Sequence, residues 1–574
     1  MRLALLLLAL LALLANALSA AEIALEPRFS GEVRAGDLLT WRVTNAPAAW
    51  LVEDVGKTPR LTITGPDGRV WTRPAYLDRT WKAGAAGGPE FVPVGESFLA
   101  VRHAVREPGL FKATLWDPAG KAVASAEVRV LAGTRPPGPL RVSADNLRLL
   151  AWADGTPFLA IGPNLAWANA PDRASDFARY CALLKAQGCT HVRVWLASWS
   201  GKPWDEQGLR LDHAWLTDQH LAAARANGLA VTLVLDNFHD VWTGRGAPWG
   251  ADSVARVANF VDKGLLPAWL DRLRYAFARW GADDAIVMWE PINEIDMLQP
   301  IRERALPWLE QAVSWIKRED LDHRLVTASW AGEDWARAMA LPGIDVAQVR
   351  GYVFEWTAAD WRLQEKTRDA IGMWLEPFAE AQRLGKPFLL AEVGYQGSNE
   401  DNRGNSLDKD GMLLRQLTWA GLMLGGCGSG MNWWWDVYID KQNLWGVYGP
   451  LAQISARLDW KDKELAPLTP NRGGAMRVLG WTSPSQALIW PVHVNDTWYA
   501  AVAQGRKRPA PIAPVTATLA GFAKDTPYQI TPLSLRDGAA GKTWTQKSLK
   551  DGRLELVIPP GTIDLVYAVK RGEP

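Results

Sequence analysis

The chain has 574 residues, of which 48% are hydrophobic and 22% are charged, and its formal net charge is +1. This composition is ordinary for a globular protein, and the length predicts about two to four domains. The sequence has no dense run of Lys and Arg, which argues against a nucleic-acid partner, because neutralising a phosphate backbone needs a concentrated basic face.

The first 21 residues are typical of a signal peptide. Arg2 precedes a long Leu/Ala run that ends in small residues, and this pattern predicts cleavage just after Ser19 or Ala21. An uncleaved membrane anchor is the alternative, since the run is nearly long enough to span a bilayer. The small residues at its end favour cleavage. We therefore expect a soluble chain, secreted or periplasmic, with no membrane association after cleavage.

Residues 22–133 alternate apolar and polar positions in short runs, which are separated by turn pairs such as Asp67-Gly68. Several short strands without a helical period predict an immunoglobulin-like β-sandwich. A stiff Pro-rich linker is expected at 134–139.

Between 140 and 465 the pattern becomes a strand followed by an amphipathic helix, many times over. This alternation predicts a central (β/α)8 barrel, and the doubly wound alternative would need a Gly-rich turn after its first strand, which is missing. The connection after the third strand is the longest and is expected to be functional. The eight expected strands are 158–164, 191–197, 230–237, 285–291, 324–329, 346–353, 387–394 and 430–436.

Residues 470–574 return to strand-like patterning and predict a second, smaller β-sandwich. The predicted fold class is thus a multidomain chain, an α/β TIM barrel flanked by two all-β domains. The three cysteines are Cys181, Cys189 and Cys427, an odd number without metal-ligand spacing, and we expect them to be buried thiols. No metal or cofactor is predicted.

The chain is unusually rich in tryptophan, with 33 Trp, most of them between 140 and 465. Many stand at expected strand ends or in the loops beyond them. Part of this set must fill the core, but exposed indole faces suit the flat, weakly polar faces of sugar rings. The Trp content therefore favours a carbohydrate ligand.

Two glutamates stand at the ends of expected barrel strands, where barrel enzymes carry their function. Glu294 follows the fourth strand and Glu392 lies in the seventh. Cleavage of a glycosidic bond needs one protonated and one ionised carboxyl group facing each other, and Asn293 beside Glu294 suits a sugar 2-hydroxyl. Glu290, four residues earlier, is expected to be structural and to pair with a barrel arginine.

These motifs resemble those of a known clan of enzymes. "WEPINE" (289–294) and "PFLLAEVGYQG" (387–397) resemble the strand-four and strand-seven signatures of the clan A glycoside hydrolases. "HVRVW" (191–195), "LDNFHD" (235–240) and "NWWWDVYI" (432–439) further resemble the cellulase/mannanase-type family 5 enzymes.

The resemblance implies that Glu294 is the acid/base and Glu392 the nucleophile of a retaining reaction, with their carboxyl groups about 5 Å apart. It also implies a hydrogen bond from Tyr352 to Glu392. A metal site at the third strand end is the alternative for His239 and the two aspartates nearby, but no second His/Cys cluster accompanies them. The expected substrate-binding residues are Arg193, Asn293, Tyr352, His239, Asp236, Trp195, Trp433 and Trp435.

One position departs from the resemblance. Many relatives have a histidine two residues before the strand-six tyrosine, and this chain has Arg350 there. A guanidinium stays charged and cannot shuttle protons, so the surroundings of the acid/base are expected to differ.

The leading hypothesis is a secreted retaining glycoside hydrolase that cleaves β-glycosidic bonds in a polysaccharide or oligosaccharide of the β-glucan or mannan class. The alternatives are an exo-acting β-glycosidase on short oligosaccharides and a non-catalytic carbohydrate-binding barrel. A barrel aldolase or metal-dependent lyase would need a Schiff-base lysine or a metal cluster at the strand ends, and the sequence offers neither. The sugar, the linkage, endo or exo action and the oligomeric state stay open.

Overall fold

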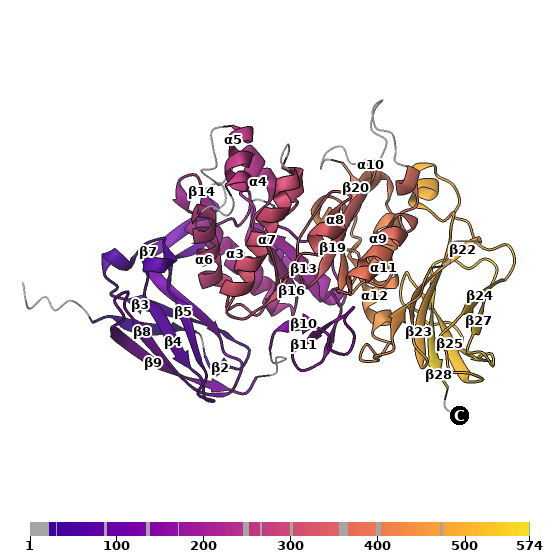
Figure 1. Cartoon of the computed structure of the whole chain (residues 1–574), viewed down its shortest axis with the longest axis horizontal. Helices are drawn as coiled ribbons and strands as arrows, with labels where there is room; N and C mark the ends of the chain where they lie inside the picture. Colours follow the sequence, from indigo (N-terminus) through magenta and orange to yellow (C-terminus); the bar gives the residue numbers. More distant parts are fainter. Residues whose placement is uncertain are drawn as a thin grey trace, which may run out of the picture. The chain divides into compact units, whose positions relative to one another are not determined.

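The computed structural model describes residues 22–29, 31–84, 89–133, 138–169, 171–244, 252–263, 267–298, 302–354, 365–397, 403–470 and 474–572. The expected signal peptide and most of the expected linker lie outside these residues. The chain divides into two compact units (Figure 1). The first comprises Met1–Pro137 with Pro267–Asp284, and the second comprises Gly138–Leu266 with Ala285–Pro574. The domain boundaries read from the sequence stay predictions.

The first unit contains two sheets that share one apolar core. Strands such as β3 alternate buried and partly exposed residues, and the buried set from both sheets includes Trp41, Ile63, Leu99 and Leu115. This arrangement is consistent with a β-sandwich. One sheet has the order β1 (Ala24–Arg28), β3 (Leu38–Thr44), β7 (Phe91–Ala104), β6 (Tyr76–Ala83), and the other β2 (Val33–Arg34), β9 (Ala122–Leu131), β8 (Gly109–Trp116), β4 (Arg60–Thr64), β5 (Val70–Pro74).

Helix α6 (Pro267–Trp280) belongs to this first unit although its sequence falls inside the expected barrel segment. Arg279 on the helix is buried and donates from Nη1 to Asp78 Oδ1 over 2.8 Å. Just beyond the helix, Asp284 binds Arg106 over 2.6 Å. Buried and half-buried ion pairs therefore fix this helix to the sandwich.

The second unit is built around parallel strands that pair in chain order. Single backbone bridges continue the pairing from Thr327 to Val346, from Val393 to Asn432, from Ala160 to Gly428 and from Asn164 back to Arg193. The result is a closed parallel ring of eight segments, which is consistent with the predicted TIM barrel. Its strands are β13 (His191–Trp195), β16 (Ala230–Val234), β17 (Ile286–Glu290), β18 (Leu325–Val326), β19 (Ala347–Phe354) and β20 (Phe388–Gln396).

The first and eighth ring segments differ from the predicted strands, because each forms only isolated bridges. Residues 157–158 instead belong to a small antiparallel sheet of β10 (Leu140–Val142), β11 (Leu150–Trp152) and β12 (Pro157–Phe158). The prediction of a strand over 430–436 was wrong beyond Asn432. Trp434 has a positive φ of 63°, which ends the extended conformation, and a π-helix begins at Trp435.

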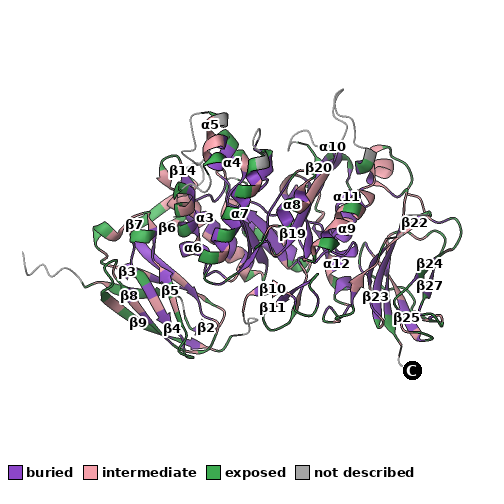
Figure 2. Ribbon diagram, in the orientation of Figure 1, coloured by how far each residue is buried: buried purple, intermediate pink, exposed green. Residues whose placement is uncertain are grey.

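Helices follow the ring strands, as the sequence pattern predicts. The Asp172 side chain caps α2 by accepting a hydrogen bond from Ser175 N. Figure 2 shows buried strands surrounded by helices whose outer faces are exposed. The longer helices of this unit are α2 (Arg173–Ala186), α3 (Leu211–Ala226), α7 (Arg302–Glu319), α9 (Leu375–Leu384), α11 (Met412–Met423) and α12 (Tyr448–Ser455). The shorter ones are α4 (Phe238–Thr243), α5 (Ser253–Val257), α8 (Trp335–Met339) and α10 (Arg403–Leu407).

The C-terminal part of the second unit contains a larger and a smaller sheet around a shared core, consistent with a second β-sandwich. It is joined by buried indoles to the segments that surround the ring: Trp481 Nε1 donates to Leu422 O of α11 over 2.8 Å, and Trp498 Nε1 donates to Thr367 O over 2.7 Å. Its strands are β21 (Ala466–Pro467), β22 (Met476–Thr482), β23 (Gln486–His493), β28 (Leu565–Arg571), β25 (Pro527–Ser534) and β26 (Trp544–Lys547), with β24 (Val515–Leu519) and β27 (Leu554–Ile558).

The cysteines are confirmed as buried free thiols. Within the part of the chain that the structure describes, no helix is both long enough and apolar enough to cross a membrane.

Candidate active site

Arg193, on β13, lies at the centre of a buried polar cluster and is 1% exposed. Its Nη2 and Nε bind the two oxygens of Glu290 over 2.6 and 2.9 Å, and its Nη1 binds Glu392 Oε2 over 2.9 Å. The prediction that Glu290 pairs with a barrel arginine is therefore confirmed. Arg193 connects the structural carboxylate of β17 with the carboxylate of β20.

Glu294 stands in the turn that follows β17, with a positive φ of 49°. This backbone region is uncommon for residues other than glycine, and such strain tends to occur at functional sites. Its carboxyl group contacts Arg350 Nη1 over 2.9 Å and accepts from Asn293 Nδ2 over 3.3 Å. Burial raises the pKa of Glu294 to about 7; the Arg350 charge opposes that rise and the Glu392 charge adds to it.

Glu392 is 3% exposed and is surrounded by donors. It accepts from Arg193, from Arg350 Nη2 and, over 2.5 Å, from the Tyr352 hydroxyl. Burial and the Glu392 charge raise the pKa of Tyr352 well above its usual value. The phenol therefore stays protonated and donates a hydrogen bond to Glu392. The hydrogen bond expected between Tyr352 and Glu392 is present, so one carboxyl group accepts from two guanidinium groups and a phenol.

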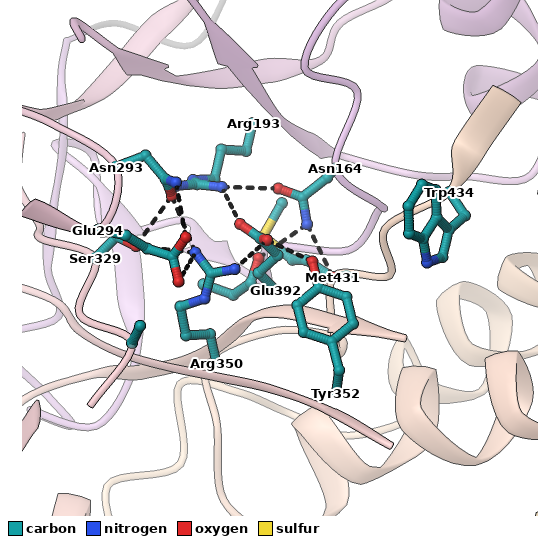
Figure 3. Close-up of polar contacts among 12 residues, drawn as sticks. Asn164, Arg193, Asn293, Glu294, Ser329, Arg350, Tyr352, Glu392, Met431 and Trp434 are labelled. Carbon is teal, nitrogen blue, oxygen red and sulfur yellow. Dashed lines mark hydrogen bonds and ion pairs between the residues drawn. The ribbon is translucent and has the colours of Figure 1, made fainter. Parts of the chain in front are cut away.

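The Arg350 guanidinium lies between the two glutamates (Figure 3). Nη1 contacts Glu294 and Nη2 contacts Glu392, so a single guanidinium group bridges the two carboxyl groups. A shift in register between Val349 and Arg350 makes Arg350 and Glu392 direct neighbours on β19 and β20. One cation thus contacts both residues expected to be catalytic.

Asn293 and two residues without a predicted role complete the cluster. Asn293 Oδ1 accepts from Arg193 Nη2 over 2.8 Å, from Arg350 Nη1 over 3.1 Å and from Ser329 Oγ over 3.1 Å. Asn164 accepts from Arg193 and donates to the carbonyls of Ala391 and Met431, which places it beside Glu392 (Figure 3). Asn164 is the last residue of the first expected strand, 158–164, but no sequence signal points to Ser329.

A cluster of aromatic rings lies next to Arg193, whose guanidinium carbon is 5.1 Å from the Trp195 ring centre. Trp433 packs edge-on against Trp167 at 5.6 Å and is tilted against Trp195 at 5.2 Å. Trp433 is partly exposed, and its contact with substrate stays a prediction. The rings of the cluster belong to Trp167, Trp195, Trp199, Trp433 and Trp435.

Trp435 does not present a free face, contrary to the prediction that it lines the cavity. It is 1% exposed, and its Nε1 donates to Trp167 O over 3.0 Å. The positive φ of Trp434 explains the difference, because the alternation of a strand no longer applies beyond it. Trp167 and Trp199, which are partly exposed, have the accessible positions instead.

The expected polar loop after the third strand has two different environments. Asp236 is fully buried and binds Lys202 Nζ over 2.6 Å, and the same ammonium binds Asp240 over 3.0 Å. His239 is exposed, and its ring lies 5.6 Å from that of Trp199. Substrate contacts of these two residues stay predictions, and burial makes the Asp236 ion pair a support of the loop.

No known family model matches the chain. Over 332 residues the chain is 24% identical to Mannan endo-1,4-beta-mannosidase 8 of Oryza sativa subsp. japonica, covering 48% of this chain and 87% of that enzyme. Over 209 residues it is 23% identical to Mannan endo-1,4-beta-mannosidase F of Aspergillus clavatus, covering 33% of this chain and 45% of that enzyme. The chain thus spans less than half the length of the Aspergillus enzyme.

The resemblance to clan A glycoside hydrolases is confirmed. Two crystal structures from Bacteroides vulgatus share the fold. One, assigned to the glycoside hydrolases, has a TM-score of 0.61 at 12% identity and covers 95% of this chain and 100% of that chain. The other, of glycoside hydrolase family 5, has a TM-score of 0.51 at 13% identity and covers 75% of this chain and 94% of that chain.

Proposed function

We propose that the chain is a retaining glycoside hydrolase that cleaves β-glycosidic bonds, with Glu294 as acid/base and Glu392 as nucleophile. One observation carries the proposal: the two carboxyl groups lie on either side of a single guanidinium, and they have different surroundings, since burial raises the pKa of Glu294 whereas Glu392 accepts from three donors. Burial favours a proton on Glu294, whereas three donors favour an ionised Glu392. Double displacement requires such a pair, one protonated carboxyl group and one ionised carboxylate.

In the first step a Glu392 oxygen attacks the anomeric carbon, the glycosidic C–O bond breaks, and Glu294 gives its proton to the leaving oxygen. In the second step Glu294 takes a proton from water, the water oxygen attacks the same carbon, and the ester bond to Glu392 breaks. Each step inverts the anomeric centre, so the product retains the configuration. Asn293 is held by two guanidinium groups and is positioned to bind the sugar 2-hydroxyl.

The proposed substrate is a β-linked polysaccharide or oligosaccharide of the mannan or β-glucan class. The names of the two related enzymes favour a mannan. The partly exposed indoles of Trp167, Trp199 and Trp433 offer faces on which sugar rings stack. His239, exposed beside Trp199, is a further proposed contact.

The proposal includes the setting of the enzyme. We place the site at the carboxyl ends of a (β/α)8 barrel, with an immunoglobulin-like sandwich before it and a smaller sandwich after it. The first 21 residues have the pattern of an export signal, and export would bring the enzyme to polysaccharides outside the cell.

Release of reducing ends from mannan, glucomannan, β-1,3- and β-1,4-glucans, xylan and galactan tests this function. We expect hydrolysis of at least one of these β-linked polymers, loss of it in Glu392→Gln, and initial products with retained configuration by proton NMR. Hydrolysis that survives in Glu392→Gln, or products with inverted configuration, would contradict the roles assigned. Binding without cleavage by the wild type would favour a non-catalytic barrel.

A further inference from the structure

Arg350 is the one described residue whose guanidinium contacts both Glu294 and Glu392, and it is about nine-tenths buried. Each contact uses a different nitrogen, so neither carboxyl group has to give up its contact for the other. The Asn293 oxygen accepts from the same Nη1 over 3.1 Å, which helps to hold the guanidinium plane. Arg350 is therefore held in a fixed place between the two acids.

The charges of the groups ion-paired with Arg193 and Arg350 balance only when Glu294 and Glu392 together hold one proton. Arg193 and Arg350 supply two positive charges, and Glu290 and Glu392 supply two negative ones. A protonated Glu294 then leaves the cluster neutral, whereas an ionised Glu294 leaves one negative charge in excess. Because a net charge is costly to bury, this set of side chains favours the state in which its total charge is zero.

The balance changes when Glu392 becomes esterified, in a step that rests on the proposed function. The ester has no negative charge, so the Nη2 side of Arg350 loses its anionic partner. Arg193 keeps Glu290 as a bidentate partner. Glu294 has by then passed its proton to the leaving oxygen, and its new negative charge makes the cluster neutral again.

We propose that Arg350 is a positioning residue that moves its charge compensation from Glu392 to Glu294 during the reaction. It supports an ionised nucleophile before the first step and an ionised base before the second. Arg350 itself neither gains nor loses a proton and contacts the reacting atoms only through the two glutamates.

Other groups besides Glu392 and Arg350 face Glu294. Asp296, on the same turn, accepts from the backbone N–H groups of Ala331 and Gly332 over 3.0 and 2.8 Å. Arg193 stays a cation, and Tyr352 stays a neutral donor because its pKa lies well above the usual value. Of the charges that act on Glu294, esterification removes that of Glu392, and Arg350 is the cation that contacts both glutamates.

The test compares Arg350→Gln, which removes the charge, with Arg350→Lys, which keeps it. The matched control is Arg324→Gln, since Arg324 is also buried in an ion-pair network, with Asp320 and Asp322, but precedes β18 at the opposite end of the strands. The readout is an infrared difference titration of the Glu294 carboxyl band, with the Glu294→Gln spectrum of the same background subtracted. This readout needs no turnover.

We expect the midpoint of this band to rise by about one pH unit or more in Arg350→Gln, since an opposite charge at this distance lowers a carboxyl pKa by about 1–3 units. Arg350→Lys and Arg324→Gln should stay near the wild type. An unchanged midpoint in folded Arg350→Gln would overturn the proposal.

The second arm measures the wild type after reaction with 2-deoxy-2-fluoro-β-mannosyl fluoride or the glucosyl analogue, which esterify a nucleophile. We expect the Glu294 midpoint to fall by about one unit or more. A Glu294 midpoint that does not change on esterification would overturn the proposal that the Arg350 charge compensates first Glu392 and then Glu294. This result would decide the question even if Arg350→Gln does not fold. Wild type that neither reagent modifies would count against the proposed function, while the first arm still decides the role of Arg350.

The third readout is the pH profile with 2,4-dinitrophenyl β-mannoside and β-glucoside, whose leaving group needs no acid. Hydrolysis of the ester then limits the rate and requires ionised Glu294. We expect the acidic limb of kcat to move to higher pH by about one unit in Arg350→Gln, which gives about a tenfold loss at pH values below both midpoints. A uniform loss at every pH would indicate only a structural role.

Discussion

Replacing Glu290 with glutamine tests whether the buried carboxylate of β17 holds the structure or takes part in the chemistry. Glu290 is fully buried, and its two oxygens receive the Arg193 fork over 2.6 and 2.9 Å. Gln348 also donates to it over 3.2 Å. A glutamine of the same shape would place an NH₂ group against one of these donors and remove the charge that faces Arg193.

The expected cost follows from that burial. Removing one partner of a buried ion pair costs about 3–5 kcal/mol, because the other charge is left without compensation. Arg193 keeps Glu392 and Asn164, which favours the lower end of this range. The matched control is Glu310→Gln on the exposed side of α7, for which a change within about 0.5 kcal/mol is expected.

Urea and thermal unfolding, followed by tryptophan fluorescence, would measure the difference, and activity would be assayed below the unfolding transition. We expect Glu290→Gln to unfold at clearly lower urea and temperature than the control while keeping measurable hydrolysis. Unfolding equal to that of the wild type would refute the stability argument. Complete loss of hydrolysis with unchanged unfolding would show that Glu290 acts in the reaction.

Four further outcomes are expected. Because the proposed acid, Glu294, donates a proton and burial raises its pKa to about 7, kcat/KM of the wild type should fall as the pH rises above about 7, in steady-state assays over a pH series. Tyr352→Phe removes a donor to Glu392 and should lower kcat about 10- to 100-fold, from a charge-assisted hydrogen bond of about 1.5–3 kcal/mol, with little change in unfolding. Trp433→Ala should raise KM for oligosaccharides more than it lowers kcat, which initial rates over a substrate series would show. Trp498→Ala should destabilise the second unit by about 3–5 kcal/mol, measured by urea unfolding, because a fully buried indole and its hydrogen bond are lost.

Sequence reasoning could locate the strand ends of the site because parallel strands deliver their last residues to one edge. Glu294 and Glu392 meet there, and the spacing from Glu290 to Glu294 was enough to separate a structural carboxylate from a candidate acid. These inferences depend on strand order and direction, which the βα alternation already contains.

Contacts between neighbouring strands could not be predicted in the same way. Arg350 stands beside Glu392 only because the pairing of β19 and β20 shifts by one residue, and a shift of this kind has no composition signature. Trp435 was misplaced for a related reason, since one residue with positive φ cancelled the assumed alternation. Buried partners such as Lys202 and Ser329 likewise depend on distances across the fold.

The connection between the ring and the C-terminal sheets has a consequence for how this protein can be modified. Trp498 packs edge-on against Tyr395 at 5.4 Å, three positions beyond Glu392, and Gln416 donates to Asp496 O over 2.7 Å. The C-terminal part of the chain therefore supplies part of the packing behind β20, the strand that carries Glu392. Truncation near residue 465 would remove these contacts. Domain exchange between related proteins should therefore transfer the ring and the C-terminal sheets together.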